Sequence, residues 1–362
     1  MKKIVLALIT VISITACTKT TEYSISGQIE GEDLNGTTIY IAERIDRVWQ
    51  AIDNVMIEDN KFTFTGENED SRVVSLRYGY AANTNAQQFV LEPGNIKITI
   101  DSLGNILVTG TKQNKIFNAF NDAEADIFNR KTEAEKTAEE RGLSVAEQEK
   151  EQQAFIDEYK ALLVKYCTKY ANTTVGRYLF TNLYYYLSVP EKEAIVSKFN
   201  KTTKLDERIQ KIIAVLEVEK TVVAGNPFVD FTQIDTDDVE LSLSSLMGKT
   251  DYVLVDFWAS WCPPCIQSFP KLKTFYDTYK GTKIEILGVS LDDNEDNWKS
   301  AIEKHELPWL HVSDLKGWNN EAAGLYAVRS IPHTILIDKE GKIVGHNMSI
   351  TGMEGLLQTK GN

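Results

Sequence analysis

The chain has 362 residues, more than one ordinary hydrophobic core supports, so the length indicates two or three domains. Hydrophobic residues make up 43 % and charged residues 25 %, a composition typical of a soluble globular protein rather than a disordered or membrane-embedded one. The formal net charge is −13, and no basic cluster offsets it. This charge argues against nucleic acid or an anionic membrane surface as a binding partner.

The first 16 residues have the pattern of a secretory signal peptide. Lys2 and Lys3 precede an apolar run, residues 4–14, that is shorter than the roughly 20 residues a membrane-spanning helix needs. Small residues then lead directly to Cys17, which resembles the lipobox of bacterial lipoproteins. We expect cleavage after residue 16, lipidation of Cys17 and a tether over residues 17–22, with a plain signal peptide as the alternative. The protein would then face the periplasm of the cell envelope, held on a membrane by lipid alone.

Residues 23–111 show short segments of alternating apolar and polar residues, separated by turn signals such as Asn35-Gly36 and Pro93-Gly94. The expected strands begin at Tyr23, Thr38, Lys61, Val73, Gln88 and Ile96. This pattern predicts an all-β, sandwich-like accessory domain. It contains no catalytic constellation, so a binding role and simple spacing from the membrane both stay open.

Residues 112–225 change to helical periodicity and predict a central α-helical region. Ser144 and Glu147 form a capping-box pattern for a new helix after the break at Gly142. Cys167 lies on an apolar stripe, which favours a buried core thiol over a reactive one. The aromatic run Tyr184–Tyr186 could line a recognition surface, although packing is the favoured interpretation.

Residues 226–362 alternate strand and helix and predict an α/β domain. A parallel crossover is followed by an antiparallel hairpin, in the order β-α-β-α-β-β, and a short helix closes the chain. The expected elements are strands at 253–257, 284–290, 334–338 and 342–345, and helices at 263–280, around 298–304 and near 353–359.

Cys262 and Cys265 are held two residues apart, directly after the apolar run Tyr252–Trp258 and at the start of a helix. There the unpaired backbone N–H groups and the positive end of the helix dipole favour a thiolate. In an oxidising compartment such an isolated pair is more typical of catalysis than of structure. Ile266 rather than histidine follows the pair, which disfavours a haem site, and the four histidines show no paired spacing for zinc.

The segment from Asp256 to Cys265, the helix residue Pro270 and the dipeptide Ile331-Pro332 together resemble the thioredoxin fold. Specifically, the segment resembles the TlpA-like and ResA-like thiol–disulfide oxidoreductases of the cell envelope, and the resemblance covers roughly the last third of the chain. The expected protein is therefore multidomain, with a sandwich-like β domain, a central helical region and a C-terminal thioredoxin-like domain.

The resemblance implies a role for each site residue. Cys262, at an exposed helix start, would be the attacking thiolate, and the more buried Cys265 would resolve the mixed disulfide. Asp256, buried in its strand with a raised pKa, would be the general base for Cys265. Ile331 and a cis Pro332 would contact substrate.

Two neighbours of the site complete these expectations. Trp261, which flanks the pair, would join Ile331 and Pro332 in contacting substrate. His333 could titrate near the site or be an exposed turn residue without a role.

We thus expect exchange of protein disulfides, in the reducing direction, with protein substrates and an upstream electron donor as partners and with no cofactor or metal. Ser268 stands where ResA-like proteins carry a glutamate, so a role in cytochrome c maturation is not implied. One alternative is a thiol-dependent peroxidase of the AhpC/TSA type, although Ala259 and Val255 replace the threonine and proline of that motif. A non-enzymatic binding lipoprotein is the other.

Overall fold

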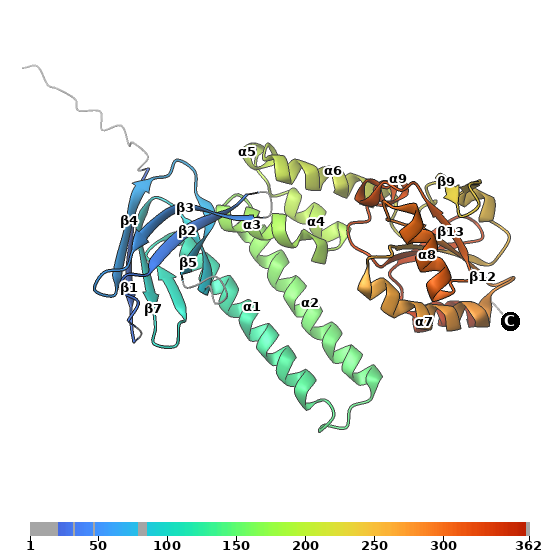
Figure 1. Cartoon of the computed structure of the whole chain (residues 1–362), viewed down its shortest axis with the longest axis horizontal. Helices are drawn as coiled ribbons and strands as arrows, with labels where there is room; N and C mark the ends of the chain where they lie inside the picture. The colour runs from blue at the N-terminus through green and yellow to red at the C-terminus, as the bar shows by residue number, and fades with distance from the viewer. Residues whose placement is uncertain (1–20, 32, 46–47, 79–84, 360–362) are drawn as a thin grey trace, which may run out of the picture. The chain divides into compact units, whose positions relative to one another are not determined.

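The computed structural model describes residues 21–31, 33–45, 48–78 and 85–359, which fall into two compact units, Met1–Thr203 and Lys204–Asn362 (Figure 1). The predicted signal peptide and lipidation site, Cys17 included, lie outside the described residues. In the described part of the chain, no helix is both long enough and apolar enough to cross a membrane.

The first unit begins with the predicted β domain, which consists of two four-stranded sheets in the orders β4-β1-β7-β8 and β3-β2-β5-β6. Alternate side chains of both sheets enter one shared apolar core that includes Ile25, Ile39 and Phe89. The strands are β1 (Glu22–Ile29), β2 (Thr38–Ile45), β3 (Val48–Met56), β4 (Lys61–Glu67), β5 (Arg72–Tyr78), β6 (Asn85–Leu91), β7 (Gly94–Ile100) and β8 (Ile106–Thr109). The sandwich-like architecture is therefore confirmed.

Two strands of this domain, β3 and β8, were not among the expected ones. β3 ends its sheet, and its residues are exposed or half-buried along their whole length, so the strand lacks the alternating apolar pattern that burial of one face produces. β8 is only four residues long and pairs with β7 alone. Short or exposed edge strands leave little periodicity in a sequence.

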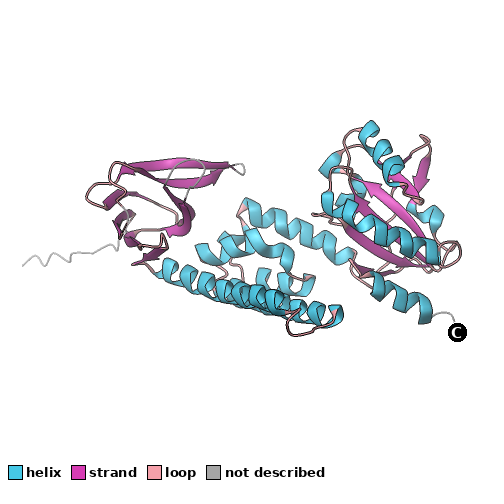
Figure 2. Ribbon diagram, turned by 60° about the horizontal axis from the view of Figure 1, so that its bottom comes forward, coloured by secondary structure: helices cyan, strands magenta, loops and turns pink. Residues whose placement is uncertain are grey.

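Helices follow the strands of the β domain along the chain (Figure 2). They belong to the first unit, except for Lys204 at the end of α5. They are α1 (Lys112–Thr137), α2 (Val145–Lys169), α3 (Thr174–Leu183), the 3₁₀ turn η1 (Tyr184–Tyr186), α4 (Val189–Val196) and α5 (Lys201–Lys204). The capping box at the start of α2 is confirmed, because Glu147 accepts from the Ser144 amide at 2.9 Å and the Ser144 hydroxyl accepts from the Glu147 amide. Cys167 is a buried free thiol whose pKa burial raises to about 12, which confirms the core assignment.

The tyrosine run is less buried than predicted. Tyr184–Tyr186 forms η1, and Tyr185 remains 59 % exposed while stacking on Tyr186 with ring centroids 4.5 Å apart. The short 3₁₀ turn gives these rings no continuous helical face to bury, so the packing interpretation is wrong for Tyr185.

The second unit contains a seven-stranded sheet in the order β10-β9-β13-β12-β11-β14-β15. Its strands are β9 (Thr232–Asp235), β10 (Glu240–Ser242), β11 (Tyr252–Trp258), β12 (Ile284–Ser290), β13 (Leu310–Ser313), β14 (His333–Asp338) and β15 (Ile343–His346). The helical elements are α6 (Glu207–Thr221), η2 (Leu243–Leu246), α7 (Pro263–Tyr279), α8 (Glu295–His305), η3 (Gly317–Asn319), α9 (Glu321–Leu325) and α10 (Ile350–Thr359).

Strand β11 is the buried centre of this sheet, with every residue inaccessible to solvent. It pairs in parallel with β12 and antiparallel with β14. Successive side chains point to opposite faces, so Trp258 packs on Phe269 of α7 while Phe257 packs on Tyr326 at the end of α9. Helical elements thus cover both faces, and the predicted C-terminal α/β domain is confirmed.

Candidate active site

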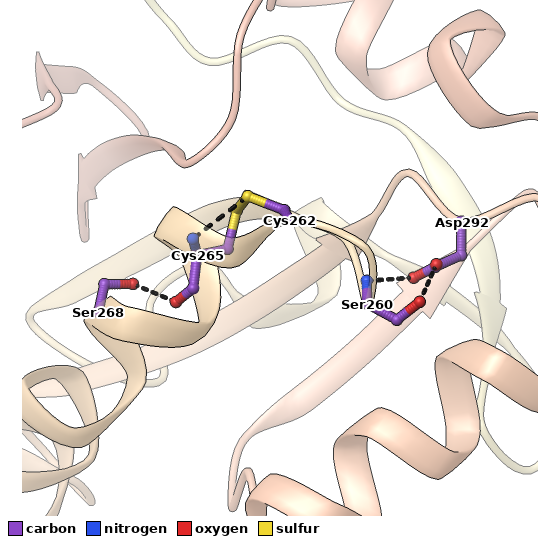
Figure 3. Close-up of a disulfide and its surroundings, with 5 residues drawn as sticks. All are labelled: Ser260, Cys262, Cys265, Ser268 and Asp292. Carbon is purple, nitrogen blue, oxygen red and sulfur yellow. Dashed lines mark hydrogen bonds between the residues drawn. A yellow bond between two sulfur atoms is a disulfide. The ribbon is translucent and has the colours of Figure 1, made fainter.

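The predicted cysteine pair lies at the start of α7 as a disulfide, with the two Cα atoms 5.3 Å apart (Figure 3). Cys262 is the N-cap residue, and Pro263 and Pro264 occupy the first two helical positions. Prolines suit these positions because the first turn of a helix has no internal partner for its N–H groups. The next amide, that of Cys265, donates to the Cys262 sulfur at 3.2 Å.

The expected exposure of Cys262 is wrong for this disulfide-bonded form. Only 3 % of Cys262 is exposed, and Cys265 is fully buried. The bond to the buried Cys265 sulfur holds the Cys262 sulfur against the helix start, where solvent does not reach it. Both cysteine side chains are therefore buried, while the neighbouring Trp261 side chain is half-exposed.

Asp256 is buried in the middle of β11, and burial raises its pKa to about 7, as predicted. Its strand neighbours are Gly288 on β12 and Thr334 on β14. Asp256 shares a face of the sheet with Trp258, which packs on α7 through Phe269. Cys265 lies one turn before Phe269 on that helix and so faces the same side. Asp256 and Cys265 therefore lie on the same side of the sheet, and the general-base role of Asp256 stays a prediction.

A second carboxylate, Asp292, was missed by the sequence reasoning. It is 1 % exposed, and it accepts hydrogen bonds from the Ser260 amide at 3.0 Å, the Ser260 hydroxyl at 2.6 Å and the Ser290 hydroxyl at 2.7 Å (Figure 3). Parallel strands end at the same edge of a sheet, so residues just after β11 and β12 meet. That rule applied to the predicted strands would have brought Ser260 and Asp292 together.

The peptide bond between Ile331 and Pro332 is cis, in agreement with the prediction. The dipeptide immediately precedes β14, which pairs with β11, the strand that leads to the cysteines. Pro332 is exposed and Ile331 is half-buried. Their contact with substrate stays a prediction.

His333 is a half-buried residue of β14, not the exposed turn residue of the alternative interpretation. It is part of a hydrogen-bonded histidine chain, Asn347–His333–His346–Val222. The Nε2 atom of His346 lies 2.6 Å from the carbonyl of Val222 and donates to it, and Nδ1 of His346 shares a hydrogen bond with Nε2 of His333 at 3.1 Å. Nδ1 of His333 then accepts from the Asn347 amide group at 3.3 Å. Burial, followed by the proximity of His346, lowers the pKa of His333 to about 4, so the His333 ring is neutral at pH 7.

The contact between His333 and His346 was not expected, because their spacing in the sequence does not indicate it. The two residues are 13 positions apart, and only the β14–β15 hairpin brings them together. Within the described residues, no group of three or more histidine, cysteine, aspartate or glutamate side chains is arranged to hold a metal ion.

Ser268 occupies the position of the glutamate found in ResA-like proteins. Its hydroxyl donates to the Cys265 carbonyl at 2.7 Å, within the first turns of α7 (Figure 3). The side chain therefore supports the helix start and brings no negative charge to it.

Two family models match the chain. Residues 224–346 match the AhpC/TSA family, and residues 23–117 match a domain of unknown function (DUF4369). The second match coincides with the β domain and carries no functional description.

Curated relatives match the C-terminal part. The thiol–disulfide oxidoreductase ResA of Geobacillus thermodenitrificans is 33 % identical over 133 residues, which is 36 % of this chain and 74 % of that protein. The ResA proteins of Bacillus cereus and Bacillus anthracis are 32 % and 31 % identical over 120 residues, 33 % of this chain. The chain spans 66 % of the length of these two relatives.

Solved structures also match part of the chain. A thiol–disulfide oxidoreductase from Bacteroides fragilis is 32 % identical, with 37 % of this chain and 99 % of that chain covered and a TM-score of 0.35. The thioredoxin domain of a thiol–disulfide oxidoreductase from Bacteroides vulgatus is 33 % identical, with 39 % and 99 % covered and a TM-score of 0.35. Through its C-terminal domain, which matches the AhpC/TSA family model, the chain belongs to the ResA-like thiol–disulfide oxidoreductases.

Proposed function

We propose that this protein reduces disulfides of other proteins through Cys262 and Cys265. The observation that carries the proposal is the disulfide at the start of α7, in which the Cys265 amide donates to the Cys262 sulfur. After reduction, the same amide and the helix dipole would stabilise a thiolate on Cys262. A thiolate is the nucleophile in disulfide exchange.

The reaction would run in two exchanges. The Cys262 thiolate attacks one sulfur of the substrate disulfide, and the other substrate sulfur leaves as a thiolate that takes up a proton. Cys265 then passes its proton to Asp256 and attacks the Cys262 sulfur, which releases the second substrate thiolate. The substrate gains two electrons and two protons, and the Cys262–Cys265 pair becomes a disulfide. An upstream dithiol donor must restore the reduced pair.

The reducing direction rests on the residues between the cysteines. Pro263 and Pro264 bring no charge and remove two N–H donors from the first turn of α7. Fewer donors stabilise the Cys262 thiolate less, and a less stable thiolate makes the pair more reducing. We therefore expect an equilibrium potential against glutathione nearer to the roughly −270 mV of thioredoxin than to the roughly −120 mV of strongly oxidising proteins on this fold.

The proposed location is the cell envelope, with the protein facing the periplasm. It rests on the signal-like residues 1–16 and on Cys17, followed by the tether at residues 17–22. Incorporation of labelled fatty acid into the full chain, and its loss in Cys17→Ser, tests the lipid anchor.

A trapping experiment tests the exchange reaction. Cys265→Ser leaves the attacking cysteine without its resolving partner, so mixed disulfides with substrate proteins should accumulate in envelope extracts. Cys262→Ser is the matched control and should trap little. Absence of mixed disulfides together with no reduction of a model protein disulfide would rule out this function. Peroxide consumption by the reduced protein without disulfide reduction would favour the peroxidase alternative, and inertness in both assays would favour a binding lipoprotein.

A further inference from the structure

Two half-exposed tryptophans lie side by side next to the disulfide. Trp261, directly before Cys262, is 49 % exposed, and Trp318 of η3 is 50 % exposed. Their ring centroids are 6.1 Å apart with an interplanar angle of 52°. The other tryptophans of the same unit, Trp258, Trp298 and Trp309, are all buried. The exposure of this one pair is therefore a local feature of the exchange site.

The loop that carries Trp261 is held in place by a buried carboxylate. Ser260 donates its amide and its hydroxyl to Asp292, at 3.0 Å and 2.6 Å. Asp292 is buried, and charge-assisted hydrogen bonds of this kind are stronger than neutral ones. The backbone on which Trp261 stands is thus anchored at the end of β12.

The loop that carries Trp318 is anchored in the same way by Asp314. The carboxylate of Asp314 accepts from the amide of Lys316 at 3.2 Å, the side-chain amide of Asn320 at 2.8 Å and the amide of Glu321 at 2.9 Å. These three donors come from both sides of η3, so they hold the turn on which Trp318 lies.

Ser290, the last residue of β12, connects the two anchors. Its hydroxyl donates to Asp292 at 2.7 Å, while its carbonyl accepts from the Ser313 hydroxyl at 3.0 Å and from the Asn320 side chain at 3.4 Å. The two tryptophan loops are therefore built on one buried polar network. A surface that is already ordered loses little conformational entropy when a partner binds.

We propose that Trp261 and Trp318 form an aromatic platform that binds an apolar side chain next to the reacting cysteine of an extended or unfolded polypeptide substrate. This inference rests on the proposed exchange function. A substrate sulfur bonded to Cys262 holds its own chain beside Trp261, so the platform is continuous with the exchange site. Paired aromatic rings bind aromatic and long aliphatic side chains best. Folded proteins bury most such side chains, so the partner that fits is a chain that has not yet buried them.

Two peptides with an internal disulfide test the platform. They share one sequence except that the residue beside the attacked cysteine is Trp in one and Ser in the other. We measure kcat and KM for both with the full chain and a dithiol donor that restores the reduced pair. We expect kcat/KM about tenfold higher for the Trp peptide, mainly through KM. Trp318→Ala should bring this ratio close to one, and Trp318→Phe should retain most of it. Tyr185→Ala, which removes an exposed aromatic ring from the other unit, should leave the ratio unchanged.

A binding measurement supports the kinetics without depending on turnover. A version of the Trp peptide with both cysteines replaced by Ser should bind the disulfide form of the chain about tenfold more tightly than its Ser-containing counterpart, and Trp318→Ala should remove the difference. Equal kcat/KM for the two peptides, or a preference that survives Trp318→Ala, overturns the platform and leaves the exchange function standing. Failure to reduce either peptide overturns both.

Discussion

Asp292 and Ser260 are joined by two hydrogen bonds, one to the Ser260 amide at 3.0 Å and one to its hydroxyl at 2.6 Å (Figure 3). Ser260 lies two residues before Cys262, in the loop between β11 and α7. Because Asp292 lies two residues after the end of β12, the end of one strand positions the loop that follows its neighbour β11. The loop before the cysteines is therefore fixed by a carboxylate from a distant part of the sequence.

Asp292→Ala should destabilise the oxidised protein by about 2–3 kcal/mol, because it leaves the buried donors of Ser260 and Ser290 without their acceptor. Asp292→Asn keeps one acceptor oxygen and should lower the free energy of unfolding by less. Urea unfolding at pH 7 measures both. The matched control is Asp293→Ala, since Asp293 is exposed and adjacent in sequence. Equal stabilities for Asp292→Ala and Asp293→Ala would contradict the anchoring role.

Asp256→Asn should make the oxidised protein more stable at alkaline pH. The folded-state pKa of Asp256 is raised from 3.8 to about 7, so the folded protein binds the proton more tightly than the unfolded chain. This contribution to stability is complete below pH 3.8 and is lost as the pH rises through 7. At pH 8 the variant should therefore gain up to about 4 kcal/mol, and near pH 4 the gain should disappear. Unfolding curves of the two proteins with a pH-independent difference would refute this account.

Asp256→Asn should also slow the attack of Cys265 on the mixed disulfide, because Asp256 is the proposed base for Cys265. Loss of a general base typically reduces a rate by about 100-fold or more. The rate is measured by stopped flow after the reduced protein reacts with a chromogenic disulfide, and the first exchange at Cys262 should change little. An unaltered second phase would remove Asp256 from the proposed mechanism.

The cysteines should differ sharply in alkylation. Cys167 is buried, and its pKa is raised to about 12, so it should stay unlabelled in the folded reduced protein at pH 8. Cys262, which heads α7, should be labelled within minutes once the disulfide is reduced. Mass spectrometry of each modified cysteine, with and without urea, checks this. Rapid labelling of Cys167 in the folded protein would contradict its place in the core.

The histidine chain should make the protein sensitive to acid. Burial lowers the pKa of His333 from 6.5 to about 4, so the unfolded chain binds a proton in this interval that the folded protein does not. The resulting contribution is present above pH 6.5 and is lost as the pH falls through 4. His333→Asn should therefore reduce proton uptake on unfolding at pH 5 by about one proton, as measured by calorimetry in buffers of different ionisation enthalpy. Unchanged uptake would show that His333 is not held neutral.

Elements with strong local patterns were predictable. The continuous apolar run of β11 and the prolines that open α7 stand next to each other in the sequence, so both the central strand and the helix that carries the cysteines were expected. β9, β10, β13 and α9 were not expected. Each is three to five residues long, which is too short for a period of two or 3.6 to emerge. Their place in the sheet comes from pairing with strands distant in the chain.

The site residues likewise fall into those that local sequence predicts and those that only the tertiary structure brings together. The spacing of Cys262 and Cys265, the burial of Asp256 and the cis bond before Pro332 were all determined by short stretches of sequence together with the family resemblance. Such features depend on a residue and its immediate neighbours, because a strand, a helix start or an X–Pro bond is a local conformation.

The tertiary structure alone decided the burial of Cys262 and the pairings of Ser260 with Asp292, Trp261 with Trp318 and His333 with His346. The two residues of each pair are 13 to 57 positions apart in the chain, and no local pattern specifies which loop ends meet. Strand order and register bring them together, since parallel β11 and β12 end at one edge and the β14–β15 hairpin turns back on itself. The sequence thus determined the reacting cysteines and Asp256. The packing of the sheet decided which carboxylate anchors their loop and which exposed side chains lie beside them.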